Sequence, residues 1–339
     1  MNKKIIALAV AAAVTAPVAM ADVTLYGRAH VDYRYTDNGT TDVWTVNSNA
    51  SRLGFKGTED LGNGLQAIFK YEVSYDIDGD STTNTSTNIL HSHTASNAPF
   101  NGARNAYVGL KGEFGKLVIG RHDTPAKSAY YGSGNDHLSD SVIDLNANMG
   151  YSQDRWNNAV QYNSPNFSGL TFGASIQPGE GNGDEDGPGD SYSVGLVYKG
   201  HGVKAGAGYV RTADTMGNDD EKMFQLGASY TMGNITVGAN YEDNSNYGTT
   251  ADQDKNVWSL AAKAKFGNNA LIANYGESET EAGGATTAET EAFGLALQHN
   301  LSKRTSVYAA YSQREENDVA MGGTTTDTDN FGIGVTHNF

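Results

Sequence analysis

The chain has 339 residues, carries 39 acidic against 23 basic side chains, and contains no cysteine. Its formal net charge of −16 argues against nucleic-acid binding, which requires a basic face. The absence of cysteine excludes a disulfide-stapled scaffold, so an exported chain of this composition needs another source of stability. A closed, fully hydrogen-bonded β-sheet is one such source.

Residues 1–21 have the features of a secretory signal peptide. Lys3 and Lys4 form a charged start, an apolar run follows, and Ala19-Met20-Ala21 has the small-x-small pattern of a cleavage site. The alternative is a membrane anchor, but the apolar run over residues 5–16 is shorter than the roughly 20 residues that span a bilayer. We expect cleavage after Ala21 and one mature domain over residues 22–339. Losing the two lysines takes its formal charge from −16 to −18.

The first mature segment alternates apolar and polar side chains with a period of two. Residues 23–35 read VTLYGRAHVDYRY. Successive side chains of a β-strand point to opposite faces. One face would carry Val23, Leu25, Gly27, Ala29, Val31, Tyr33 and Tyr35, and the other Thr24, Tyr26, Arg28, His30, Asp32 and Arg34. The pattern predicts a strand with one face toward lipid and one toward water.

The same alternation recurs along the whole chain. It is found in residues 65–77, 192–198, 224–230, 235–241, 258–266 and 331–339. Short connections include residues 200–201, 233–234 and 267–269, and long polar ones include 36–48, 79–101, 178–190, 243–256, 277–289 and 315–328. Short turns at one end and long loops at the other are typical of outer-membrane barrels.

These segments predict an all-β fold, a transmembrane antiparallel up-and-down β-barrel of about 16 strands. In lipid every backbone amide needs an internal partner, so the sheet should close, with the first strand paired to the last. A barrel of this width leaves an aqueous lumen. The connection between Arg121 and Arg155 is roughly thirty residues long, and connections of that length are usually functional. It could fold inward and narrow the lumen.

Several stretches resemble the general diffusion porins of Gram-negative bacteria. They are LYGRAHVDY near the mature start, SRLGFKGTEDLGNGLQAIFKYE (51–72), ARNAYVGLKGEFGKLVIGRHDTP (103–125), NFSGLTFGAS (166–175) and the final Phe339. The resemblance covers nearly all of the mature chain. It implies a trimer of 16-stranded barrels whose third long loop folds into the pore.

In that family basic residues on the barrel wall face acids on the inward loop. The basic positions carry over to Arg28, Arg52, Arg104 and Arg155. The parity of a residue, meaning its place in the period-two alternation, indicates the face of the strand on which it lies. Parity places Arg28, Arg52 and Arg155 opposite the apolar face, whereas Arg104 shares the parity of apolar neighbours. The Pro-Glu-Phe-Gly stretch of many relatives is missing, so the acid candidates are Asp136, Asp140 and Asp144. The alternative is that these arginines are rim charges or structural ion pairs.

Two further residues have candidate roles outside the lumen. Arg121 shares the parity of Leu117 and Ile119, so it should point outward. The resemblance implies a contact with a neighbouring subunit, and a residue snorkelling near the headgroups is the alternative. Phe339 has lipid-facing parity, which suits simple packing. By resemblance, a terminal aromatic is also a signal for the outer-membrane assembly machinery.

No metal, cofactor or catalytic site is predicted. Asp76, Asp78 and Asp80 resemble the start of a calcium loop, but the twelfth position is Thr87 where such a loop needs Glu. A loose cation site there, or a weak metal site at the His-Ser-His of residues 91–93, remains an alternative to a solvated loop. The sequence contains no Gly-x-Ser-x-Gly, His-Glu-x-x-His or phosphate-binding glycine motif.

The leading hypothesis is passive diffusion of ions and small hydrophilic solutes through a homotrimeric channel in the outer membrane. Its partners would be the lipid, the lipopolysaccharide and the assembly machinery. A substrate-specific channel is the nearest alternative, and an outer-membrane enzyme or adhesin barrel is the alternative from another class. The overall negative charge favours cations in the vestibules. The arginines oppose this locally, so the expectation leans only weakly toward cations.

Overall fold

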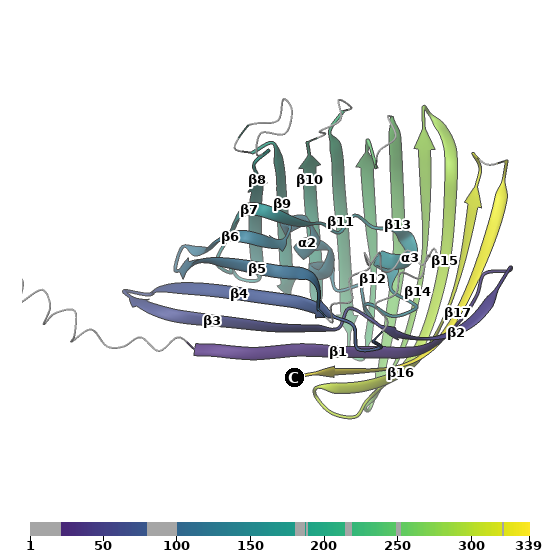
Figure 1. Ribbon diagram of the computed structural model, residues 1–339, viewed down its shortest axis with the longest axis horizontal. Coiled ribbons are helices and arrows are strands. Elements are labelled where there is room, and N and C mark those ends of the chain that lie inside the picture. The colour runs from purple at the N-terminus through teal and green to yellow at the C-terminus, as the bar shows by residue number, and fades with distance from the viewer. Residues whose placement is uncertain are drawn as a thin grey trace, which may run out of the picture.

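The structure is a computed structural model, and it describes residues 22–79, 100–179, 187, 189–213, 219–248, 252–320 and 322–339. Figure 1 shows one sheet wound upon itself, with two short helices drawn within it. The strands are β1 (Asp22–Asp37), β2 (Asp42–Ser48), β3 (Arg52–Gly62), β4 (Leu65–Tyr75), β5 (Phe100–Gly112), β6 (Gly115–Asp123), β7 (Arg155–Asn163), β8 (Leu170–Gln177), β9 (Ser191–Gly200), β10 (Val203–Thr212), β11 (Glu221–Met232), β12 (Ile235–Ser245), β13 (Gln253–Phe266), β14 (Asn269–Ala282), β15 (Ala285–Asn300), β16 (Thr305–Asp318) and β17 (Thr324–Asn338). The helices are α2 (Pro125–Ser133) and α3 (Leu145–Met149).

The sheet closes, as the alternation predicted. Each described strand is antiparallel to its neighbours, and β1 pairs with β17 from Arg28↔Asn338 to Asp37↔Asp329. β2 and β3 both pair with β1, β2 along residues 31–37 and β3 along residues 22–28. The seventeen labelled strands therefore occupy sixteen positions around the barrel. The expected closed barrel of about 16 strands is confirmed.

The two faces of the wall differ in the way that the period-two pattern requires. Along β11, Phe224 and Leu226 are 45% and 52% exposed, whereas Met223 and Gln225 between and beside them are buried. The exposed apolar face suits lipid. The other face is lined by polar side chains and is partly covered by a segment of the chain that packs against it. Among the described residues, no helix is both long and apolar enough to cross a membrane.

Some predicted long loops are shorter than expected. Residues 277–289 belong mostly to β14 and β15, which are joined by Gly283 and Gly284 at φ 58° and 78°. Two positive φ values in a two-residue turn fit the hairpin geometry that glycine favours. The prediction was wrong because both faces of this hairpin are polar, so the apolar alternation that marks a membrane strand is missing.

The connection over residues 124–154, called the long connection below, packs against the inner face of the wall. α2 begins after Thr124, whose side chain accepts from the Lys127 amide at 3.1 Å, and it is capped after Ser133 by Gly134 with φ 74°. α2 contacts β8 to β12, and α3 contacts β14 and β15 (Figure 1). The buried apolar clusters of the described chain all include residues of this connection. The core therefore lies between the long connection and the wall.

Glycines on the inner face let the long connection approach the wall closely. A Cβ atom at Gly208 would lie 2.8 Å from Cα of Ala126, and one at Gly294 would lie 2.8 Å from Cβ of Ile143. Similar close approaches occur at Gly227 and Gly276. Because these positions lie on four different strands, the wall is shaped over a wide arc to receive the long connection.

Candidate functional site

Arg28 lies on the inner face of β1 and reaches the long connection. Its Nη1 atom forms an ion pair with Oδ2 of Asp140 at 2.6 Å, and its Nη2 atom donates to the carbonyl oxygen of Ser139 at 3.1 Å. The side chains of Arg28 and Asp140 are 14% and 23% exposed. Asp140 adopts φ 64°, a conformation uncommon for a residue with a side chain. The structure thus brings together one predicted arginine and one predicted acid.

Arg104 faces inward because β5 carries a bulge. The register between β4 and β5 shifts on both sides of Val73, where β5 contains extra residues. A bulge re-aims the side chains near it. Nε of Arg104 lies 2.9 Å from Oε1 of Glu72, and Oε2 of Glu72 accepts from Lys70 at 3.3 Å and from the Tyr26 hydroxyl at 2.8 Å. The bulge explains why Arg104 shares the parity of apolar residues and yet contacts Glu72.

Arg155 is paired with an acid at the end of β6. Its Nη2 atom lies 2.7 Å from Oδ1 of Asp123. The same oxygen lies 3.4 Å from Nζ of Lys127, and Oδ2 accepts from the side-chain Nδ2 of Asn105 at 2.8 Å. Asp123 therefore joins β5, β6, β7 and α2 through one carboxylate.

Arg52 has a different environment from the other three arginines. It sits opposite Arg28 in the register of β1 and β3. No carboxylate of the described residues lies within ion-pair distance of its guanidinium. Arg52 lines a cavity of about 380 Å³ together with Arg28, Asp136, Gln298 and Arg304. Among the four arginines predicted to line the lumen, it is the one without an ion pair in the described part of the chain.

Asp144, the third candidate acid, is buried within the long connection. It is 4% exposed, and its Oδ1 atom accepts from the Ala147 amide at 3.2 Å at the start of α3. Its Oδ2 atom accepts from the Asp140 amide at 2.5 Å. Burial, together with the nearby Asp140, raises the pKa of the Asp144 carboxyl to about 6. A buried helix start needs an acceptor for its free amides, and Asp144 fulfils that need.

Asp136 lies in the same part of the long connection. Its Oδ2 atom is buried and has no hydrogen-bond partner within the described structure. Burial, with Asp144 and Asp140 close by, raises the pKa of Asp136 well above its ordinary value. Of the three candidate acids, Asp140 alone forms an ion pair with a wall arginine among the described residues.

The contacts described for Arg121 lie within this chain, and its predicted outward orientation stays a prediction. Its Nε atom donates to the carbonyl oxygen of Ala103 at 2.7 Å, and Nη1 donates to Oδ1 of Asn157 at 2.5 Å. These contacts tie β6 to both neighbouring strands. At the chain end, the Phe339 amide and carbonyl exchange hydrogen bonds of 3.1 and 3.0 Å with Gly27, and the ring lies over that glycine. Phe339 thus completes the closure of the barrel.

The calcium-like segment is described only in part. Oδ2 of Asp78 accepts from the Ser48 amide at 2.8 Å. Asp80, Thr87, His91 and His93 lie outside the described residues, as does the predicted signal peptide. Within the described ranges, no group of three His, Asp or Glu side chains is placed to hold a metal ion.

Sequence reasoning missed three residues of the site. Glu72 and Asp123 neutralise wall cations, and Tyr131 projects from α2, 41% exposed, beside a cavity of about 420 Å³. Glu72 did carry a signal, because it lies on the polar face of residues 65–77. Asp123 and Tyr131 carried none, since their positions depend on how the long connection leaves β6.

Comparison with known proteins agrees with this geometry. The model of the Gram-negative porin family matches residues 7–320. The major outer membrane protein P.IB of Neisseria gonorrhoeae is 33% identical over 219 residues, which are 60% of this chain and 56% of that protein. The match thus spans a little over half the length of that relative.

Two other similar proteins are matched over more of their length. Outer membrane porin protein 32 of Delftia acidovorans is 28% identical over 340 residues, covering 94% of this chain and 91% of that protein. The solved structure of an anion-selective porin from Comamonas acidovorans has the same fold, with a TM-score of 0.71, 23% identity, and coverage of 94% of this chain and 100% of that one. This chain therefore belongs to the Gram-negative porin family and is a β-barrel of the outer membrane.

Proposed function

We propose that the chain forms a water-filled channel for passive diffusion of ions and small hydrophilic solutes across the outer membrane. The observation that carries the proposal is a closed barrel of sixteen strand positions whose inner face bears charged side chains. A barrel of this width is too wide for wall side chains to fill. Passive diffusion needs no catalytic step, and we propose none.

The narrowest part of the channel lies where the long connection meets the wall arginines. Arg28, Arg52, Arg104 and Arg155 line one side, and Asp140 contributes an acid from the other, with Asp136 beside it. Charges of opposite sign across a narrow aqueous gap align water dipoles and favour polar solutes. Rings of charged side chains are also a common basis of ion selectivity.

The charge of this region supports a preference for anions. The three ion-pair groups contain Glu72, Asp123 and Asp140 as acids, with five cations around them. Arg52 adds a sixth cation without an acidic partner among the described residues, so six cations face four acids once Asp136 is counted. The local excess of positive charge outweighs the long-range negative field, because salt screens charges more than about 10 Å away. This proposal differs from the weak expectation of cation preference, in which the overall negative charge outweighed the arginines.

Assembly and targeting follow the family pattern in this proposal. Residues 1–21 act as a signal peptide, cleaved after Ala21, and Phe339 is read by the outer-membrane assembly machinery. The barrel forms a homotrimer within lipid and lipopolysaccharide, and Arg121 supports a subunit contact. An Arg121→Ala trimer that melts in detergent at the wild-type temperature would remove Arg121 from that contact.

Recording purified protein in planar bilayers with a series of sugars of rising size tests the channel. We expect stable open steps whose conductance falls for small sugars and recovers once a sugar is too large to enter. Saturable block by one sugar or one anion would favour a substrate-specific channel instead. Insertion without current would favour an adhesin or enzyme barrel.

A further inference from the structure

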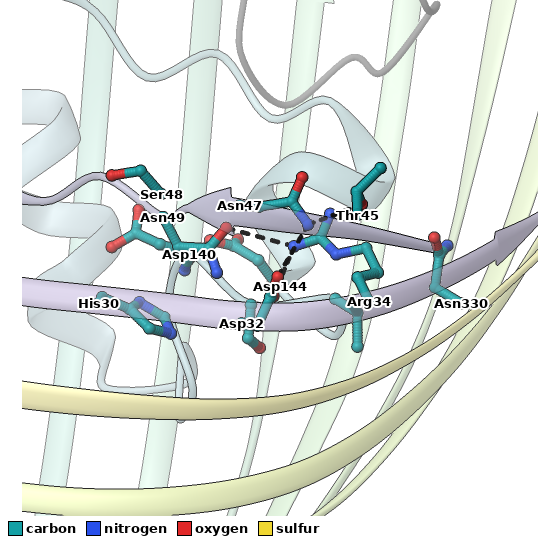
Figure 2. Close-up of polar contacts among 12 residues, drawn as sticks. His30, Asp32, Arg34, Thr45, Asn47, Ser48, Asn49, Asp140, Asp144 and Asn330 are labelled. Atoms are coloured by element: carbon teal, nitrogen blue, oxygen red, sulfur yellow. Dashed lines mark hydrogen bonds and ion pairs between the residues drawn. The ribbon is translucent and has the colours of Figure 1, made fainter. Parts of the chain in front are cut away.

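His30 is a fully buried histidine two residues from Arg28 on the same face of β1. Its Nδ1 atom lies 2.9 Å from Nη2 of Arg28, and its Nε2 atom lies 2.8 Å from the hydroxyl oxygen of Tyr308 on β16. Figure 2 shows His30, Asp32 and Arg34 in order along β1. The diffusion mechanism described above uses none of these three side chains, although they adjoin the proposed constriction.

The protonation state of His30 follows from its partners. A guanidinium group can only donate, so Nδ1 of His30 must be the acceptor for Arg28. The ring is therefore neutral, carries its proton on Nε2, and donates to the Tyr308 hydroxyl. The Tyr308 hydroxyl in turn donates to Oδ2 of Asp32 at 3.5 Å, at the limit of a hydrogen bond.

Asp32 is itself held firmly. Its Oδ2 atom forms an ion pair with Arg34 at 2.7 Å, and the side chains of Asp32 and Arg34 are only 0% and 4% exposed. Its Oδ1 atom accepts from the side-chain Nδ2 of Asn47 at 3.0 Å (Figure 2). A buried acceptor fixed in this way orients the hydroxyl that faces it. A Tyr308 hydroxyl turned toward Asp32 accepts from Nε2 of His30, and it thereby supports the tautomer that Arg28 requires, as outer partners commonly do for histidine.

The interruption between β2 and β3 holds the backbone of His30. The His30 carbonyl accepts from the Asn49 amide at 2.8 Å and from the Ser51 hydroxyl at 3.1 Å, and the His30 amide donates to Ser51 Oγ at 3.0 Å. Asn49 and Ser51 lie in the short gap between the two strands. The gap thus fixes the backbone of His30, and the contacts of its two ring nitrogens with Arg28 and Tyr308 hold the imidazole.

We propose that His30 is the positioning residue of Arg28. Nη2 of Arg28 donates to both His30 and the Ser139 carbonyl, which leaves Nη1 directed at Asp140. His30 thereby holds the guanidinium in the orientation that clamps the long connection to β1. Its neutral lone pair, not its bulk, performs this role. The inference rests on the proposed channel, since the clamp acts on the channel's narrowest part.

Open-channel current noise in planar bilayers tests the clamp. His30→Phe keeps a ring but removes the acceptor, whereas His30→Asn keeps an acceptor oxygen close to the position of Nδ1. Without this hydrogen bond to a charged group, the long connection should leave β1 more often. The ratio of molecules with the long connection held by Arg28 to molecules with it released should fall by about ten-fold. We expect higher noise in His30→Phe, near wild-type noise in His30→Asn, and no further increase when His30→Phe is added to Arg28→Ala.

The outcomes separate the proposal from a purely structural role. Wild-type noise in His30→Phe, equal noise in His30→Asn and His30→Phe, or additive effects with Arg28→Ala would each overturn it. Melting temperatures in detergent are measured in parallel. If His30→Phe does not fold, Tyr308→Phe, which removes only the hydroxyl, carries the test, and wild-type noise in it would overturn the proposal. A wild-type protein that passes no current would instead refute the channel itself.

Discussion

A methyl group added at Gly208 would test whether the long connection rests directly on the wall. An ideal Cβ atom there lies 2.8 Å from both Cα and Cβ of Ala126 in α2. Carbon atoms pack at about 3.5–4.0 Å, so α2 must move by roughly 0.7 Å in Gly208→Ala. Overpacking of this kind typically costs about 1–3 kcal/mol. Because the wall is continuous and hydrogen-bonded, α2 is the part that moves, toward the lumen.

The expected result is a smaller single-channel conductance and a lower unfolding temperature in detergent. The matched control is Gly332→Ala, where the nearest atom to the new Cβ is Cγ1 of Val142 at 3.3 Å, with other atoms at 3.7 Å and beyond. That contact needs only a slight adjustment, so the control should stay close to wild type. If Gly208→Ala and Gly332→Ala are indistinguishable in both measurements, the packing argument is refuted.

Three further predictions concern charge. Arg52→Ala should raise single-channel conductance and shift the reversal potential toward cations, because it removes a wall cation that has no described ion-pair partner; unchanged values would place Arg52 outside the constriction. Glu72→Gln should shift the reversal potential the opposite way, because Arg104 and Lys70 lose their shared carboxylate, and a shift toward cations would contradict the local charge count. Asp144→Asn should flatten the pH dependence of unfolding between about pH 4 and 6. The folded-state pKa of about 6 lies above the ordinary 3.8, so the folded protein binds the extra proton and loses stability as pH rises through this window, by an amount on the order of 3 kcal/mol. Equal slopes for wild type and variant in detergent melts would show that Asp144 does not titrate there.

The barrel could be predicted from sequence because lipid imposes a simple pattern. A strand with one face in lipid must alternate, and β1 and β11 do so without interruption. The pattern weakens where both faces meet water, as in the hairpin of β14 and β15. It also says nothing about β2, whose pairing to β1 depends on the gap around Asn49 and Ser51.

The site was harder to predict than the barrel. Parity identified Arg28, but Arg104 needed the bulge in β5, which no local signal in the sequence marks. The acids were harder still. A carboxylate on a long connection can pair with a wall arginine, as Asp140 does, or cap a helix, as Asp144 does, and only the path of the backbone decides between them.

The decisive experiment is the reversal potential of the wild-type channel in a potassium chloride gradient. The proposed channel is an open aqueous barrel whose narrow part carries more positive than negative groups. We expect open channels whose reversal potential has the sign of the chloride equilibrium potential. This preference for chloride should weaken at high salt as the charges are screened. Inserted protein that passes no current would contradict the proposed channel, and so would a reversal potential with the sign of the potassium equilibrium potential.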